Sequence, residues 1–337
     1  MPELNTISQG DFVKLANIIF EKAKDSVQQL ARTSGLFKVD PLPLNSGESR
    51  EYTSIDLEEY AKRKPEGDQA KRAKVQQGYT RTLTLYRVAE DIGITYEMRT
   101  RNKYPDVIAR LTNLASLGIN RLDLDLSHRV GFGTAASYTD LDGVVVSITL
   151  GDGLSFFNTA HTLRGSSATY RNRLAGNPQL SRGALESIER QAIENTLNQF
   201  GEKVTVPYDI LWTTDDPNTV NTAREYLQST AEISAPNAGV INVYKGKYRH
   251  ITLPRVATTA TGAVDTAKRK YWGVASSMFS SAHLAVSEEP RLKTPPADGK
   301  SNEEFSTDDW NFGVRGGWGI AIVDGNWMQF SSGDGAA

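Results

Sequence analysis

The 337-residue sequence contains no cysteine. This absence excludes disulfide bonds, thiolate metal sites and a cysteine nucleophile, and it leaves the redox compartment open. No apolar run approaches the roughly 18 residues needed to span a membrane, and the N-terminus, MPELNTISQGD, lacks the basic start and the apolar stretch of a signal peptide. We therefore expect a protein with no membrane segment that stays in the compartment where it is made.

Apolar side chains and net charge are also scarce. The apolar fraction is 39%, below the roughly 45 to 50% of an ordinary soluble domain, and the mean hydropathy is -0.43. The formal net charge is -2, so no overall basic field favours tight, nonspecific binding of nucleic acid. Because the chain is longer than one typical domain, the composition predicts either two packed units or one elongated subunit with much polar surface.

Helical spacing of apolar residues is the clearest pattern that the sequence does contain. The strongest case starts at Pro105, where apolar residues recur every three or four positions as far as Val130. Ser181 and Asp216 are placed to cap the starts of two shorter helices. We expect helices over residues 8–34, 105–130, 181–200 and 217–229.

Residues 48–104 alternate between polar and apolar side chains and are rich in threonine, which predicts strands. At the centre of this region lies a charged stretch with almost nothing to bury. Its cations are Lys62, Arg63, Lys64, Lys71, Arg72 and Lys74. We expect a long two-stranded β-arm with a mobile, charged tip, which is marginal in water without a partner surface.

Three interpretations of the basic tip are open: contact with phosphates, simple solvation, or docking on an acidic patch of another copy of the chain. The third suits an extended arm best. Stacking on single-stranded nucleic acid is poorly supported because no aromatic residue lies between Lys62 and Lys74.

The segment SFFNTAHTLRG contains the most conspicuous candidate for chemistry, His161. A general base or a metal ligand needs a second convergent group, and the sequence does not place one. We expect a structural loop in which the ring of His161 hydrogen-bonds to a backbone group while Phe156 and Phe157 pack beneath it. A hydrolase that uses His161 with a nearby aspartate is the alternative.

Other apparent motifs are also expected to be structural. In LDLDLSH, Asp123 and Asp125 lie two residues apart on a helix and cannot share an ion, whereas Asp125 and His128 are expected to pair on an exposed face. GFGTAA ends a helix, which argues against dinucleotide binding. TDLDGV lacks the third acid and the closing glutamate of a calcium loop. We therefore assign no catalytic residue, no metal ligand and no cofactor, and we expect a protein that is not an enzyme.

The order of these parts resembles the major capsid protein of tailed bacteriophages, which has the Hong-Kong-97-type fold. VQQGYTRTLTLYRVAEDIGITYEM is similar to one strand of that family's extended loop, and LTNLASLGINRLDLDLSHRVGFGT is similar to its spine helix. SFFNTAHTLRG followed by NPQLSRGALE resembles a phrase of head proteins that include those of Mu-like prophages. DILWTTDDPNTVNTAREYLQS and KYWGVASS resemble parts of the axial domain.

The resemblance implies an α+β fold in five parts. These are an N-terminal arm with an amphipathic helix (1–44), an extended β-loop (45–91), a peripheral domain (92–204) with its spine helix (105–130), an axial domain (205–300), and C-terminal strands that return to the body (301–337).

The resemblance also implies a virion protein, assembled in the host cytoplasm, that forms hexamers and pentamers of an icosahedral shell around double-stranded DNA. The partners it implies are further copies of the chain, a scaffolding protein, a portal protein and, as a further candidate, a decoration protein. Some relatives carry a scaffolding segment before the N-terminal arm. Here the first helix begins by residue 8, and Met1 favours a separate scaffold over an earlier cleavage. A nanocompartment shell of the encapsulin type is the alternative with the same fold.

Overall fold

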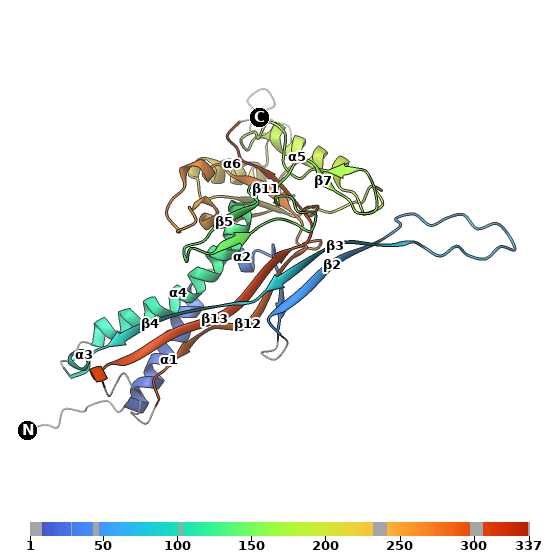
Figure 1. The fold of residues 1–337 in the computed structure, drawn as a ribbon. Coiled ribbons are helices and arrows are strands. Elements are labelled where there is room, and N and C mark those ends of the chain that lie inside the picture. Colours follow the sequence, from blue (N-terminus) through green and yellow to red (C-terminus); the bar gives the residue numbers. More distant parts are fainter. Residues whose placement is uncertain are drawn as a thin grey trace, which may run out of the picture.

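The computed structural model describes residues 9–27, 29–42, 47–100, 104–231, 241–296 and 306–335. The subunit is elongated, with a long helix and sheet at one end, a second sheet at the other, and an arm that projects from the junction between them (Figure 1). Strand and helix share the described chain in a mixed, α+β arrangement. None of the helices in these described ranges is long and apolar enough to cross a membrane.

The first four-stranded sheet, here called the spine sheet, has the order β1-β12-β13-β4. Its strands are β1 (Lys38–Pro41), β12 (Ala282–Lys293), β13 (Trp310–Ile322) and β4 (Tyr86–Ile94). Strand β13 pairs antiparallel with both β12 and β4, whereas β1 pairs parallel with β12. Two long strands at the centre give this end of the molecule its length.

The spine sheet is covered by α4 (Tyr104–Gly131), against which α1 (Gln9–Ser26) packs; a short helix, α3 (Tyr96–Thr100), precedes α4. At 1.5 Å per residue the 28 residues of α4 extend about 42 Å. Phe12 and Phe20 of α1 meet Leu111 of α4 and Phe312 of β13 in one buried cluster. The helix predicted over 105–130 is confirmed.

The N-terminal helix differs from the prediction, because it is not continuous to residue 34. It stops at Ser26, and a separate turn of helix, α2 (Leu30–Thr33), follows. The reason is a contact across 92 residues of sequence, in which the carboxylate of Asp123 on α4 accepts the backbone N–H of Ala31 at 2.8 Å. That tertiary hydrogen bond satisfies a donor at the start of α2 and fixes α2 against α4.

The second four-stranded sheet has the order β10-β9-β11-β14. Its strands are β9 (Ile210–Thr213), β10 (Arg249–Thr252), β11 (Trp272–Ala275) and β14 (Met328–Ser331). Leu211 and Val274 pack with α5 (Arg182–Asn195) and α6 (Pro217–Gln228), whereas Ile210 and Trp212 point into the main core. The alternation of side chains along each strand therefore joins two hydrophobic clusters through one sheet.

The predicted caps at the starts of α5 and α6 are confirmed, whereas the predicted end of α5 is wrong. Ser181 accepts the N–H of Ala184, and Asp216 accepts the N–H of Thr219. The helix predicted to run to residue 200 instead ends at Asn195, and Thr196 adopts an extended conformation with its hydroxyl donating to the carbonyl of Ala192. The freed residues 196–204 form a tight turn that contacts the arm.

Short elements complete the described chain. They are the hairpins β5 (Ser137–Thr139) with β6 (Val145–Ser147) and β7 (His161–Thr162) with β8 (Thr169–Tyr170), and the 3-10 turns η2 (Pro254–Ala257) and η3 (Thr266–Lys268).

Candidate functional site: the arm and its support

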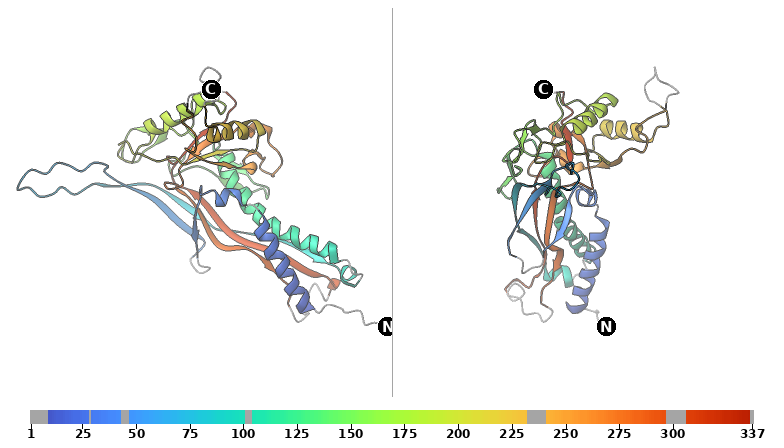
Figure 2. Two further views of the ribbon diagram at one scale, coloured as in Figure 1. Left: turned by 180° about the vertical axis from the view of Figure 1, so that it is seen from behind. Right: turned by 90° about the vertical axis from the view of Figure 1, so that its right-hand side faces the viewer.

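The arm consists of β2 (Ser49–Leu57), β3 (Val75–Thr84) and the connecting residues 58–74, here called the tip. The two strands pair antiparallel from Ser49 opposite Thr84 to Leu57 opposite Val75. In two opposite views the arm extends away from the body in the direction opposite to the start of α1 (Figures 1 and 2). Strand β4, which includes residues 86–91 of the predicted extended loop, pairs with β13 in the spine sheet instead.

The register of the two strands shifts between Thr53 and Ile55. Such a bulge adds one residue to one strand and changes which side chains face each side of the ribbon. Beyond it, Asp56 and the opposing Gln76 share one face, whereas Ile55 with the opposing Gln77, and Leu57 with the opposing Val75, share the other. The outer half of the ribbon therefore has a polar face and a face that is apolar except for Gln77.

The polar face rests on the chain's own body, on a surface that we call the arm support (residues 147–165 and 196–202). The carboxylate of Asp56 accepts the N–H of Gln199 at 2.9 Å, and Arg164 donates to the carbonyl of Gly78 at 3.2 Å. The hydroxyls of Tyr79 and Thr162 lie 2.9 Å apart. We expected the ribbon to lack any cover before it meets a neighbour, and for its inner face that expectation is wrong, because the subunit supplies this polar support.

Glycine permits the close approach between the arm and its support. A Cβ atom at Gly151 would lie 2.3 Å from the Cβ of Tyr79, and one at Gly165 would lie 2.8 Å from the Cγ of Gln76, both on the arm. Both distances are far below ordinary van der Waals contact, so a side chain at either glycine would push the arm away from the body.

Where the arm joins the spine sheet, it is held by a small core and a polar pair. Leu83 is buried against Leu42, Ala285 and Ala321. Tyr52 stacks on the ring of His283 at 4.0 Å between centroids and donates its hydroxyl to Asp40 at 2.8 Å. Burial, followed by this hydrogen bond, raises the pKa of Tyr52 to about 12, so the phenol remains a neutral donor at physiological pH.

The tip is uncovered beyond its base, where the N–H of Glu59 donates to the carboxylate of Glu202 at 2.8 Å. Every residue from Glu59 to Val75 is exposed. Among the six predicted contact cations, Lys62 donates to Glu58 at 3.0 Å, and this hydrogen bond, together with the N–H of Lys74, lowers the pKa of Glu58. Within the described ranges Arg63, Lys64, Lys71, Arg72 and Lys74 have no ion pair. Their role in contacts between subunits stays a prediction.

The loop that contains His161 is folded around that residue. The ring is fully buried and stacks on Tyr170, with Nδ1 lying 2.8 Å from the carboxylate of Asp152 and Nε2 lying 3.2 Å from the carbonyl oxygen of Phe156. The expected hydrogen bond to a backbone group is therefore present. Since both ring nitrogens face acceptors, neither is free to accept a proton from a substrate.

The partners of His161 are equally buried. Burial alone would raise the pKa of Asp152, but the hydrogen bonds from His161 and from the N–H of Leu154 outweigh it and lower that pKa. Phe156 and Phe157 stack at 4.3 Å, and Phe157 also stacks on Phe330 of β14. The loop fastens the region of the arm support to the second sheet.

Asp123, Asp125 and His128 of α4 are buried, so the expected exposed pairing of Asp125 with His128 is wrong. Asp125 accepts hydrogen bonds from Arg121 at 2.9 Å, from the hydroxyl of Tyr86 at 2.8 Å and from the indole N–H of Trp318 at 3.1 Å. His128 instead contacts the hydroxyl of Thr258 at 2.9 Å. Burial lowers the pKa of His128 to about 4, so its ring is neutral at physiological pH.

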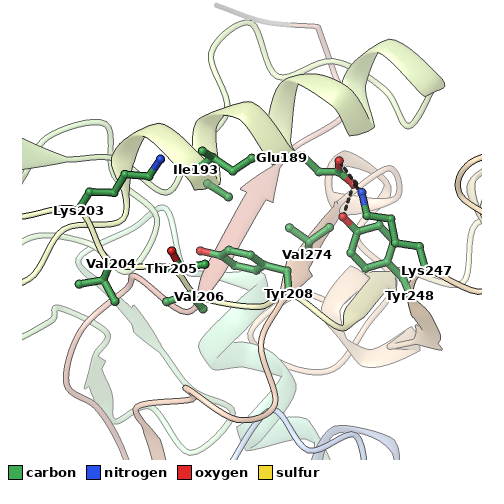
Figure 3. A pocket seen from close by; sticks show the side chains of 11 residues that line it. Glu189, Ile193, Lys203, Val204, Thr205, Val206, Tyr208, Lys247, Tyr248 and Val274 are labelled. Carbon is green, nitrogen blue, oxygen red and sulfur yellow. Dashed lines mark hydrogen bonds and ion pairs between the residues drawn. The ribbon is translucent and has the colours of Figure 1, made fainter. Parts of the chain in front are cut away.

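A cavity of about 410 Å³ lies between α5 and the segment 203–208, with Tyr208 and Tyr248 among its walls (Figure 3). Its one carboxylate, Glu189, is bound to Lys247 at 2.7 Å and to the hydroxyl of Tyr248. No group of three or more histidines and acids in the described ranges is arranged to hold a metal ion.

Comparison with known proteins identifies the fold. No family model matches the sequence, and no curated protein matches it. The chain is similar to a solved structure of Gordonia phage Cozz, with a TM-score of 0.50, 11% identity, and coverage of 90% of this chain and 85% of that one.

Two further similar structures are the capsid structure of the cyanophage P-SCSP1u (TM-score 0.49, 12% identity, 88% and 86% coverage) and a virus-like particle from Pyrococcus furiosus (0.47, 11%, 94% and 98%). The likeness to the Gordonia phage structure confirms the predicted α+β fold of the Hong-Kong-97 type. The Mu-like subtype and the domain boundaries stay predictions.

Proposed function

We propose that the chain is the major capsid protein of a tailed bacteriophage, which assembles into hexamers and pentamers of an icosahedral head. The observation that carries this proposal is the phage fold, which extends over 90% of the chain and includes an arm whose tip has no cover. An extended tip with six cations gains little by becoming ordered on its own, since every residue from Glu59 to Val75 is exposed. A neighbouring copy supplies the missing surface.

The first partner of such a subunit follows from its exposed arm, and the others follow from the resemblance to capsid proteins. The first partner is the chain itself, which receives the arm. A scaffolding protein and a portal protein are proposed to direct the assembly in the host cytoplasm, with a decoration protein as a further candidate on the finished virion. The net charge of -2 suits a shell that encloses double-stranded DNA without binding it tightly, because each contact with a phosphate would add salt-dependent affinity for the DNA.

A structural role also accounts for the groups that first appeared catalytic. His161 has an acceptor at each ring nitrogen and no exposed surface, and Glu189 is already bound to two partners. Within the described ranges, these geometries favour support of the fold over turnover. We therefore propose that the chain is not an enzyme.

Electron microscopy of the purified protein, alone and with its scaffolding protein, tests the proposal. We expect shells or isolated hexamers and pentamers. A species that stays monomeric and compact under all conditions contradicts it. The contents of the particles separate the two shell functions, since a phage head holds double-stranded DNA whereas a nanocompartment holds an enzyme.

A further inference from the structure

Two arginine side chains meet at the root of the arm. Arg81 lies on β3, and Arg129 lies in the last turn of α4. Both bind Ser147 of the arm support, since Arg81 donates to its hydroxyl at 3.0 Å and Arg129 donates to its carbonyl oxygen at 2.8 Å. Arg81 also donates to the hydroxyl of Thr149 at 3.3 Å. We call these four residues the arginine pair site.

The positive charge of this site is not compensated, because neither guanidinium has an ion pair among the described residues. Asp125, four residues before Arg129, is bound to Arg121 at 2.9 Å, and Asp140 is bound to the same Arg121 at 3.1 Å. Burial, followed by the nearby charge of Arg129, lowers the pKa of Arg81. Since an arginine nevertheless stays protonated at physiological pH, two like charges lie close together.

The arginine pair site also has more hydrogen-bond donors than acceptors. The Nε of Arg129 is buried and has no partner within the described ranges. The hydroxyl oxygens of Ser147 and Thr149 lie 3.0 Å apart, so one of their two hydrogens serves that contact and the other is left for a further acceptor. Because a buried donor without an acceptor costs free energy, the site is incomplete with protein groups alone.

An anion with several oxygen atoms supplies what the site lacks. The planar fork of a guanidinium binds two oxygens of a phosphate or a carboxylate at once. A phosphate carries more negative charge than a carboxylate near neutral pH, and its tetrahedral oxygens can meet two forks and a hydroxyl that do not lie in one plane. Arg81 and Arg129 are both half-buried, which favours a small free ion over the backbone of a nucleic acid.

We propose that the arginine pair site binds one free phosphate ion, which links the root of the arm to α4. The four residues come from β3, from α4, and from the end of β6 with the segment that follows it. An ion held by all of them fastens the arm to the body and cancels the repulsion between the two arginines. The inference goes beyond the proposed function and concerns a single subunit, because the site needs no second copy.

Isothermal titration calorimetry of the full-length protein with inorganic phosphate, at constant ionic strength in chloride, tests the site. We expect one phosphate ion per subunit. Arg81→Gln should weaken binding by about tenfold or more, because it removes one of the two forks. The matched control is Arg63→Gln, which removes the same charge from the exposed tip and should leave the affinity unchanged. The absence of phosphate binding by the wild type, or an equal loss in both variants, overturns the inference.

A conservative variant and two competitors identify the chemistry of the ligand. Arg81→Lys keeps the charge but not the fork, so it should bind phosphate more weakly than the wild type, and equal binding would contradict the assignment of two forks. Sulfate, which is also tetrahedral, should displace the bound phosphate in phosphorus NMR spectra. Acetate or duplex DNA, at the same concentration of anionic groups, should not. Displacement by acetate would assign the site to a carboxylate and displacement by DNA to a nucleic acid, and either result contradicts the proposal.

Amide hydrogen exchange tests whether the ion fastens the arm. Phosphate should slow exchange over residues 79–83 of β3 in the wild type, because the ion holds Arg81 to α4, and it should have no effect there in Arg81→Gln. Helix α5 serves as the internal control and should exchange equally with and without phosphate. Unchanged exchange over residues 79–83 in the wild type contradicts the link. A wild-type chain that binds phosphate but forms no shells leaves this site intact and counts against the proposed function instead.

Discussion

Replacing Asp324 with asparagine should make the folded subunit more stable at neutral pH. Asp324 lies in the link between β13 and β14, where its carboxylate accepts the N–H of Asn326 at 3.1 Å. Burial is the main cause that raises the pKa of Asp324 to about 6, and the charge of Asp56 on the arm adds to it. The hydrogen bond from Asn326 and the nearby His161 act in the opposite direction without cancelling the rise.

The direction of the effect follows from proton binding. The ordinary pKa of an aspartate is 3.8, so between about pH 4 and 6 the folded chain holds a proton on Asp324 that the unfolded chain has lost. The free energy of unfolding therefore falls as the pH rises through this window. A rise in the pKa of Asp324 from 3.8 to about 6 corresponds to a change of about 3 kcal/mol in the free energy of unfolding. Asp324 is only partly buried, so solvent screens part of this effect. We therefore expect the free energy of unfolding to fall by about 2 kcal/mol across this pH window.

Asp324→Asn keeps an oxygen for the N–H of Asn326 and removes the charge. Urea unfolding, followed by circular dichroism from about pH 4 to 7.5, should show equal stability of variant and wild type at the acid end. At the neutral end the variant should gain about 2 kcal/mol. Subtracting the free energy of unfolding of the wild type from that of the variant at each pH removes the contribution of all other groups that titrate in both proteins. Asp91→Asn, at an exposed position, is the control and should change neither value. A variant that is less stable at neutral pH, or whose difference from wild type does not vary with pH, refutes the reasoning.

Three further predictions concern the arm and its support. Deleting residues 60–76 should leave a folded subunit that assembles poorly in electron micrographs, and an unchanged shell yield would show that the tip is dispensable. His161→Ala leaves the carboxylate of Asp152 buried without its ring partner and should cost about 3 to 5 kcal/mol in urea unfolding, so a loss below about 1 kcal/mol would contradict the structural role. Gly165→Ala should speed hydrogen exchange at the N–H of Gln199 by about tenfold, because the new Cβ displaces the support; Gly183→Ala, with open space around it, should have no effect.

The regular parts of the fold could be predicted because their signals are local. The helix over 105–130 follows from apolar spacing alone, and the caps Ser181 and Asp216 follow from residue type and position. The arm follows from alternation around a charged stretch, since such a stretch has nothing to bury.

What escaped prediction depends on contacts between residues far apart in the chain. The break before α2 is fixed by Asp123, and the end of α5 belongs to a turn that contacts the arm. The burial of Asp125 needs Trp318 from β13, which the spacing of LDLDLSH does not reveal. The side chains that face each side of the outer arm depend on the register shift between Thr53 and Ile55, and the sequence pattern of β2 does not predict that shift.

The order in which the chain is synthesised gives the position of β13 a consequence. This strand lies inside the spine sheet, between β12 and β4, and the short link after it leads into β14 of the other sheet. Both sheets therefore remain incomplete on the ribosome until residues 310–331 have emerged, although the arm was made more than two hundred residues earlier. The arm is therefore synthesised before the two sheets of the body can be completed. We expect a chain to become able to join other copies only after β13 and β14 have been made and have folded.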